Sequence, residues 1–98
     1  MSESSPKRNV IHLSEEAWRT VAYRLDLADR ELDVIRAIVA DQHDREIAAA
    51  LGISRHTVRT HARRLRAKLG CTSRVQLVER VLAEYLGFLG NIASSPPS

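Results

Sequence analysis

The sequence contains little cysteine, glycine, proline or aromatic residue. Cys71 is its single cysteine, which excludes an internal disulfide framework and fits a reducing compartment. Aromatic residues make up 4% of the 98 residues, and the chain has only four glycines and three prolines. A composition poor in Gly and Pro and rich in Ala, Leu, Val and Arg is typical of helical proteins, so we expect an all-α fold.

Long apolar runs are missing as well. No stretch approaches the roughly 20 apolar residues of a membrane span, and residues 1–10 lack the apolar core of an export signal. We therefore expect a cytoplasmic protein with no membrane contact. The length suits one small domain, and an apolar content of 44% is enough to build one core.

Residue patterns that catalyse reactions or hold cofactors are also missing. His43, Asp44 and Glu46 lie close together, but no cysteine or second histidine stands at a helical ligand spacing from them. Ser54 and His56 have no third residue to orient them as a nucleophile and its base. No Gly-rich phosphate loop is present. We therefore expect no enzymatic activity, no metal site and no cofactor.

Acidic residues are absent from residues 54–69, and this absence is the most informative one. The segment carries six Lys or Arg residues, and residues 41–70 together hold seven basic and three acidic side chains. The net charge of +3 therefore arises from this stretch. An unopposed basic helix indicates an anionic partner, and nucleic acid is the first candidate. A basic face that only meets solvent is the alternative.

Helical spacing separates the apolar and basic residues of this segment onto two sides. The stripe expected to pack into a core consists of Val58, Ala62, Leu65 and Leu69. The opposite side consists of His56, Arg59, Thr60, Arg63 and Arg64. This sidedness favours a helix that packs on one face and binds a partner on the other.

The residues before this segment predict a helix-turn-helix motif. Asp44 is expected to cap a short helix, and Gly52 to end it, because Gly takes the left-handed conformation without steric cost. Ser54 offers an N-cap hydroxyl to the basic helix. Ala48, four residues before the glycine, leaves room for a steep crossing, and Val58, six residues after it, packs the second helix on the first. This pattern predicts a second helix presented to the major groove.

Two helices are expected before the motif. Residues 13–26 form the first, capped by Ser14, and residues 29–40 form the second. Trp18 lies on the apolar face of the first helix, which must pack on its own domain or on a twin subunit. We interpret Trp18 as a core residue.

A last helix is expected from Ser73. It is expected to have a wide apolar face, extended by Phe88 and Leu89, that consists of Val75, Val78, Val81, Leu82, Tyr85 and Leu86. This is more apolar surface than a small helical unit needs, so part of it is expected to meet another subunit. A mobile arm is expected over residues 1–12 and a disordered tail over residues 91–98.

From Leu27 to about Leu86 the chain resembles the LuxR-type (GerE-like) helix-turn-helix domain of bacterial transcription regulators. The matching residues are Arg30-Glu31, Val34-Ile35, Glu46-Ile47-Ala48, Leu51-Gly52-Ile53-Ser54, Thr57-Val58-Arg59-Thr60-His61, Lys68-Leu69-Gly70 and Ser73-Arg74. The most diagnostic part is the run TVRTH, followed seven residues later by KLG.

The resemblance implies a four-helix domain over residues 27–90, preceded by the additional helix, that binds double-stranded DNA as a homodimer. The third family helix, residues 54–69, would lie in the major groove. Its implied base-reading residues are Arg59, Thr60 and Arg63. Its implied contacts to the DNA backbone are Ser54, Arg55, Thr57, Arg64 and Lys68. The implied dimer contact consists of Val78, Val81, Leu82 and Tyr85.

Three positions depart from the family pattern. Ala28 replaces the Thr or Ser that usually caps the first family helix, so this cap is either lost or moved to Asp26 or Asp29. Asp41 replaces a glycine after that helix, and Cys71 replaces an aliphatic residue. None of these positions lies on the basic face.

Only about 26 residues precede the resemblance, too few for a receiver or ligand-sensing domain. This predicts a stand-alone regulator or a fragment of a longer one. Its control would then come through its own abundance or through a regulatory protein that docks on the Trp18 helix or the C-terminal helix.

Two other interpretations are open. Region 4 of an alternative sigma factor has a similar motif, although His61 and the KLG and SR elements favour the LuxR type. A protein-interaction or dimerisation module could keep the fold without DNA binding. The unopposed arginine face argues against such a module, although an acidic protein is also a suitable partner for it.

Overall fold

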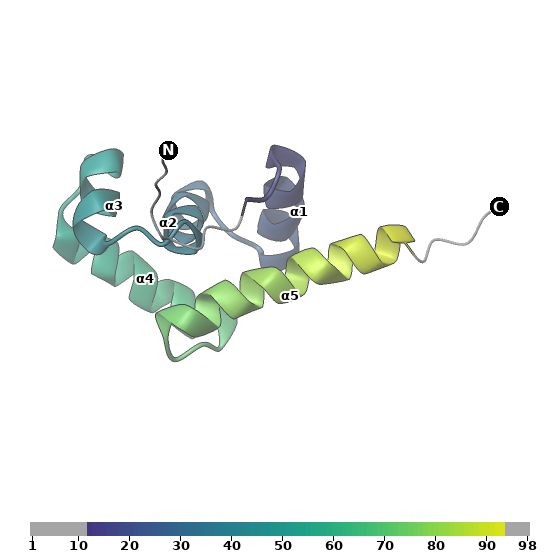
Figure 1. Cartoon of the computed structure of the whole chain (residues 1–98). Coiled ribbons are helices and arrows are strands. Elements are labelled where there is room, and N and C mark those ends of the chain that lie inside the picture. The colour runs from purple at the N-terminus through teal and green to yellow at the C-terminus, as the bar shows by residue number, and fades with distance from the viewer. Residues whose placement is uncertain (1–11, 94–98) are drawn as a thin grey trace, which may run out of the picture.

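The computed structural model describes residues 12–93. All regular secondary structure within this range is α-helical, which confirms the expected all-α fold. The helices are α1 (Glu15–Leu25), α2 (Asp29–Val39), α3 (Asp44–Leu51), α4 (Arg55–Leu69) and α5 (Arg74–Ala93). Figure 1 shows α1, α2 and α4 along α5, with α3 packed on α4 beyond the start of α5. The last turns of α5 project beyond the other helices. α5 thus continues past residue 90, where the sequence suggested an end. Residues 1–11 of the predicted arm and residues 94–98 of the predicted tail lie outside the described residues.

Side-chain hydrogen bonds mark the starts of α1 and α2. The Ala17 amide donates to Ser14 Oγ at 3.0 Å, which confirms Ser14 as the N-cap. Ala28 precedes α2 and has no capping side chain, so this cap is lost, one of the two expected outcomes. Glu31 compensates from inside the helix, because its Oε1 accepts a hydrogen bond from the Ala28 amide at 2.8 Å.

The start of α3 differs from the prediction. Asp44, expected as the cap, is the first helical residue, and His43 occupies the N-cap position. The His43 amide donates to Glu46 Oε1 at 2.7 Å, so Glu46 stabilises this end from the third helical position. The prediction for Asp44 was wrong because the reach of the Glu46 carboxylate shifts the start of α3 by one residue.

The helix-turn-helix motif has the expected geometry. Gly52 ends α3 with a φ of +68°, and the Thr57 amide donates to the Ser54 Oγ that caps α4 at 3.0 Å. Ala48 and Val58 are both buried, Val58 completely. The roles predicted for these four residues of the turn and crossing are therefore confirmed.

One apolar core joins all five helices. On α4 the predicted stripe provides Val58, Leu65 and Leu69 to this core, with Ala62 packed at its edge. The largest completely buried side chains are Val21, Val34, Ile35, Ile47, Val58, Leu65, Leu77 and Val81. Because α4 is anchored on this face, its opposite face is held outward. No described helix is long and apolar enough to cross a membrane.

The additional helix α1 is part of this core. Trp18 is buried, and the Arg36 guanidinium of α2 lies 5.3 Å from the centroid of its ring. Arg36 also forms two hydrogen bonds to the Glu15 carboxylate, at 2.9 and 2.6 Å. The apolar face of α1 therefore packs on its own domain, and Trp18 offers no surface to a regulatory protein.

Asp41 adopts the left-handed conformation that its position in the family pattern suggests. Its φ is +61°, in the connection between α2 and α3. Asp and Asn tolerate this region better than other non-glycine residues, because their short side chains cost less strain there. The departure from glycine therefore leaves the path of the chain intact.

We expect Gly52→Ala to lower the free energy of unfolding by about 1–2 kcal/mol, because a Cβ is strained at positive φ even where the surrounding space is empty. Gly87→Ala is the matched control: Gly87 lies inside α5, and the nearest atom to an added Cβ is 3.8 Å away. This control should gain up to about 1 kcal/mol from helix propensity. Urea denaturation measures both, and equal changes in the two variants would contradict the assigned turn.

Candidate nucleic-acid interface

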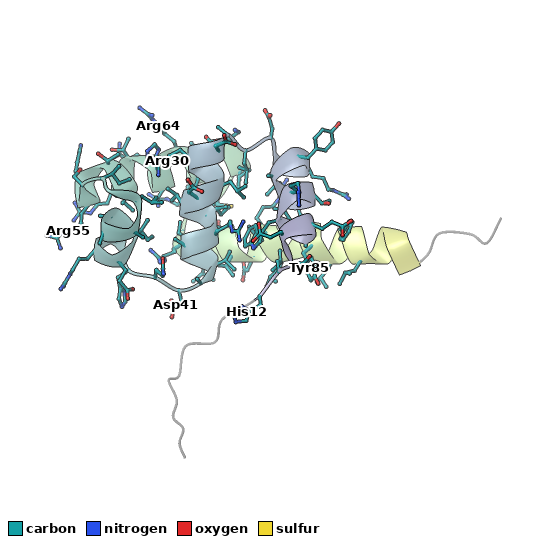
Figure 2. The ribbon with its side chains drawn as sticks, turned by 90° about the horizontal axis from the view of Figure 1, so that it is seen from above. His12, Arg30, Asp41, Arg55, Arg64 and Tyr85 are labelled. Carbon is teal, nitrogen blue, oxygen red and sulfur yellow. The ribbon has the colours of Figure 1, made fainter. Side chains whose placement is uncertain are left out.

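The outward face of α4 is basic and largely unpaired. Arg55, Arg63 and Arg64 are exposed, and Figure 2 shows Arg55 and Arg64 extending away from the body of the molecule. Within residues 12–90, no carboxylate forms an ion pair with these three arginines. Cations crowded along one helix repel one another, so an anion on this face is favoured.

Three hydroxyl groups lie along the first turns of α4. Ser54 Oγ accepts the capping hydrogen bond and lies 2.9 Å from Thr57 Oγ1. Thr60 Oγ1 donates to the His56 carbonyl at 3.1 Å. Each hydroxyl oxygen has further lone pairs for a hydrogen bond to a partner. The start of α4 also carries the positive end of the helix dipole, which favours anions.

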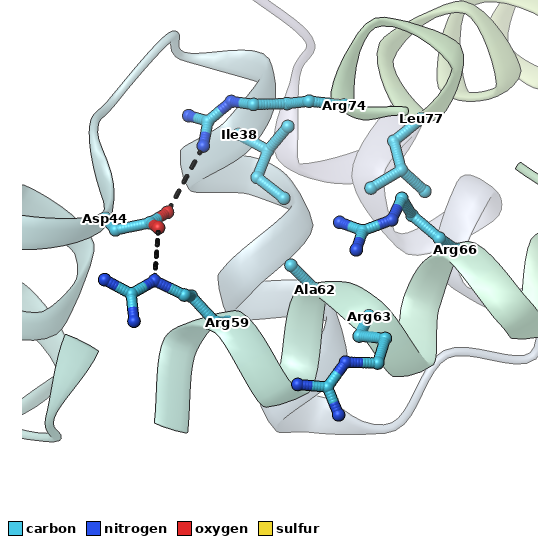
Figure 3. Close-up of a pocket in the computed structure, with 8 residues that line it drawn as sticks. All are labelled: Ile38, Asp44, Arg59, Ala62, Arg63, Arg66, Arg74 and Leu77. Atoms are coloured by element: carbon cyan, nitrogen blue, oxygen red, sulfur yellow. Dashed lines mark hydrogen bonds and ion pairs between the residues drawn. The ribbon is translucent and has the colours of Figure 1, made fainter. Parts of the chain in front are cut away.

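An acidic residue pairs with the base-reading candidate Arg59, and the sequence did not reveal this contact. Asp44 Oδ2 lies 3.6 Å from Arg59 Nε, and its Oδ1 lies 3.5 Å from Arg74 Nη1 (Figure 3). Arg74 also donates to the Gln42 carbonyl. The first residues of α3 and α5 are thereby tied to α4. Arg59 is restrained at one edge of the basic face while its side chain is still 59% exposed.

Lys68, which was expected to contact the DNA backbone, has hydrogen-bond partners within the protein. Its Nζ donates to Glu31 Oε1 at 2.8 Å and to the Asp26 carbonyl. The lysine therefore joins the end of α4 to the start of α2 and to the turn after α1. The Glu31 carboxylate already offsets the charge of Lys68, and these hydrogen bonds use two of its three N–H donors, so the geometry gives it a structural role.

The Lys68 contact makes part of the stability depend on pH. The hydrogen bond from Lys68, assisted by that from the Ala28 amide, outweighs desolvation and holds the pKa of Glu31 below its ordinary value of 4.5. A carboxylate with a lowered pKa in the folded state stabilises the fold above its unfolded pKa. This stabilisation is lost as the pH falls through the folded pKa.

We expect Glu31→Gln to lower the free energy of unfolding at pH 7 and to reduce its dependence on pH below about pH 4.5, the ordinary pKa of this carboxyl. Glu79→Gln, an exposed position on α5, is the control and should keep the acid dependence of the original protein. Denaturant titrations between pH 2 and 7 provide the test. Parallel pH profiles for all three proteins would contradict the assigned role of Glu31.

The predicted dimer contact on α5 needs one correction. Val81 has no exposed surface, because its side chain packs inside the core of its own subunit. Val78 and Tyr85 are half-buried and pack against the same core, and Leu82 is also half-buried. Val81 can therefore support this surface from beneath, but it is not available to a partner.

An exposed apolar stripe follows the outer side of α5. Its members stand three or four residues apart and so share one face. The stripe consists of Val75, Val78, Leu82, Leu86 and Leu89. Val75 and Leu86 are 65% and 62% exposed, high values for side chains of this kind. The stripe retains Val78 and Leu82 from the predicted set and reaches the part of α5 that projects beyond the bundle (Figure 1).

Residues 25–81, which contain α2, α3, α4 and the first half of α5, match the model of the family described as bacterial regulatory proteins, luxR family. This match covers more than half of the chain. The chain belongs to the luxR family. The resemblance of the turn and of the basic helix to this family is thereby confirmed, and α1 lies outside the part shared by the luxR family.

The chain is similar to named transcriptional regulators. Over 56 residues it is 41% identical to the transcriptional regulatory protein MctR of Rhizobium johnstonii, which covers 57% of this chain and 26% of MctR. Over 49 residues it is 43% identical to the nitrate/nitrite response regulator protein NarP of Escherichia coli, which covers 50% of this chain and 23% of NarP. The luxR-family chain thus spans about a quarter of the length of these relatives. No solved structure matches the chain.

Proposed function

We propose that this luxR-family domain binds double-stranded DNA with α4 in the major groove and regulates transcription in a sequence-specific way. The observation that carries the proposal is the outward face of α4, which holds several exposed arginines and no acidic residue of its own. The diameter of an α-helix matches the roughly 12 Å width of the major groove. The buried stripe on the other side of α4 packs on the core and so supports an outward orientation of the basic face.

The base-reading residues of the proposal are Arg59, Thr60 and Arg63. The two arginines stand one helical turn apart and are exposed, so both guanidinium groups can reach base edges along one side of the groove. A guanidinium donates two hydrogen bonds to O6 and N7 of guanine, which favours a guanine-containing half-site. Thr60 lies between them in the sequence, and its hydroxyl group can make a single hydrogen bond to a base edge.

The proposed contacts to the DNA backbone come from the start of α4 and from one flank of the basic face. Ser54, Arg55 and Thr57 lie at the start of α4, where the helix dipole favours phosphate, and Arg64 lies on its flank. Lys68 is left out because of its hydrogen bonds to Glu31 and Asp26. These contacts supply affinity and orientation, while sequence preference comes from the base-reading residues.

The proposed functional unit is a homodimer that uses the apolar stripe of α5. Exposed Val75, Leu86 and Leu89, together with half-buried Val78 and Leu82, form a continuous seam on which an identical helix can pack. A two-fold dimer places two copies of α4 in successive major grooves, about 34 Å apart. The expected DNA site is therefore partly symmetric.

Selection from random-sequence duplex DNA, followed by a salt titration on the selected site, tests the proposal. We expect a recurring, two-fold symmetric site. With two arginine–phosphate contacts per subunit, Arg55 and Arg64, the affinity of the dimer should fall about a hundredfold between 50 and 200 mM salt. Binding to an acidic protein surface is the competing outcome. Absence of any duplex binding at low salt would overturn the proposal.

A further inference from the structure

A pocket with an excess of positive charge lies beside the proposed base-reading residues, between α4 and the starts of α3 and α5. It has a volume of about 310 Å³. Its floor is apolar, and four arginines and one carboxylate surround it (Figure 3). The lining residues are Ile38, Asp44, Arg59, Ala62, Arg63, Arg66, Arg74 and Leu77. Arg66 and Arg74 are the two arginines of this pocket to which neither the resemblance nor the proposed function gives a DNA contact.

The charges around this pocket do not cancel. Asp44 is the one carboxylate among the lining residues, and it is shared between Arg59 and Arg74. Arg63 and Arg66 form no ion pair with any residue that the structure describes. Arg66 is half-buried, so its charge is only partly solvated. An anion bound here would offset the repulsion between these cations and complete the hydrogen bonds of Arg66.

The position of the pocket beside the proposed DNA-binding face indicates which anion would fit it. Arg59, Arg63 and Arg66 follow one another at four- and three-residue intervals, and Ala62 stands three residues after Arg59, so the pocket opens along one flank of α4. A helix in the major groove has one sugar-phosphate backbone along each flank. Arg64 is the proposed phosphate contact on the flank away from the pocket. Arg74 is the first residue of α5, where the positive end of the helix dipole adds to the attraction.

We infer that this pocket binds a phosphodiester group of the DNA backbone, held by the guanidinium groups of Arg66 and Arg74. The planar guanidinium of Arg66 can donate paired hydrogen bonds to phosphate oxygens. Arg74, whose Nη1 and Nη2 already contact Asp44 and Gln42, adds its positive charge and its remaining N–H donors. Asp44 holds Arg74 in place from the other side of the pocket. The inference rests on the proposed DNA binding. It adds one phosphate contact, shared by a residue of α4 and a residue of α5, on the flank opposite Arg64.

The test compares Arg66→Gln with the original protein on the selected duplex and on random duplex DNA, over a salt series. We expect Arg66→Gln to weaken binding to both duplexes by the same factor, roughly tenfold at low salt. The slope of log affinity against log salt should fall by about one for each subunit. Arg66→Lys keeps the charge and should retain most of the slope while it loses the paired hydrogen bonds.

Arg80→Gln is the matched control, because it removes the same charge from an exposed residue of α5 that pairs with Glu84 at 3.7 Å, away from the pocket. Thermal unfolding confirms that each variant is folded. If the original protein binds DNA and Arg66→Gln changes neither the affinity nor the slope against salt, the phosphate-binding inference is overturned and the proposed function is unaffected. A loss of affinity for the selected duplex alone would make Arg66 a base-reading residue, and this result would also overturn the phosphate-binding inference. If the original protein binds no duplex, both the pocket and the proposed function fail.

Discussion

Replacing Arg59 and Arg63 together by alanine should abolish discrimination between the selected DNA site and random duplex. Each arginine that donates two hydrogen bonds to guanine contributes about 1–3 kcal/mol of discrimination, so the pair accounts for roughly 30-fold selectivity or more in each subunit of the dimer. Weak, salt-sensitive binding should persist, because Arg55 and Arg64 still contact phosphates. Competition titrations with the selected and random duplexes measure both quantities.

Arg30→Ala together with Arg80→Ala is the control for this double variant. It removes two exposed arginines that form ion pairs with acidic residues of their own helices, Arg30 with Asp33 at 3.6 Å and Arg80 with Glu84 at 3.7 Å. These residues lie on α2 and α5, so the control lowers the total charge equally and should keep the selectivity. If the control and the Arg59/Arg63 variant lose selectivity to the same extent, net charge rather than base reading explains the effect.

Trp18→Ala should remove a large part of the stability of the domain. Truncation of a buried tryptophan costs about 3–5 kcal/mol, and the stacking of Arg36 on the ring is lost as well. A domain of this size has about 5–10 kcal/mol in total, so the melting temperature should fall by at least about 15 °C. The result would show that α1 is an integral part of the folded unit.

Tyr23→Ala is the matched control for this prediction. Tyr23 lies on the same helix and is 87% exposed, so its truncation should change the free energy of unfolding by less than about 0.5 kcal/mol. Calorimetry of the two variants separates packing of α1 from a general effect of aromatic loss. A change below about 1 kcal/mol for Trp18→Ala would mean that α1 contributes little to the core.

The helices and the turn were predictable because their signals are local. Ser14, Gly52 and Ser54 act on backbone groups within a few residues, and spacing along one helix identified the buried stripe of α4. The α3 cap lies at His43 rather than Asp44, where the Glu46 carboxylate at the third helical position accepts a hydrogen bond from the His43 amide. Both carboxylates were visible in the sequence, and only geometry decided between them.

The contacts that modify the basic face were not predictable, because they join residues far apart in the sequence. Asp44 meets Arg59 and Arg74 only after α3, α4 and α5 have packed together, and Lys68 meets Glu31 in the same way. The full burial of Val81 likewise depends on how α5 rotates against the core. Helical spacing gives the faces of a helix, but packing decides which face is covered.

The most direct test of the central claim is a titration of ¹⁵N-labelled protein with the selected duplex, monitored through the backbone amide signals. The proposed interface predicts the largest shifts over residues 54–66, at the start of α3 and at the start of α5. The amides of α1 should change little. Shifts confined to α1 and the projecting end of α5, with α4 unaffected, would contradict the claim that α4 enters the major groove.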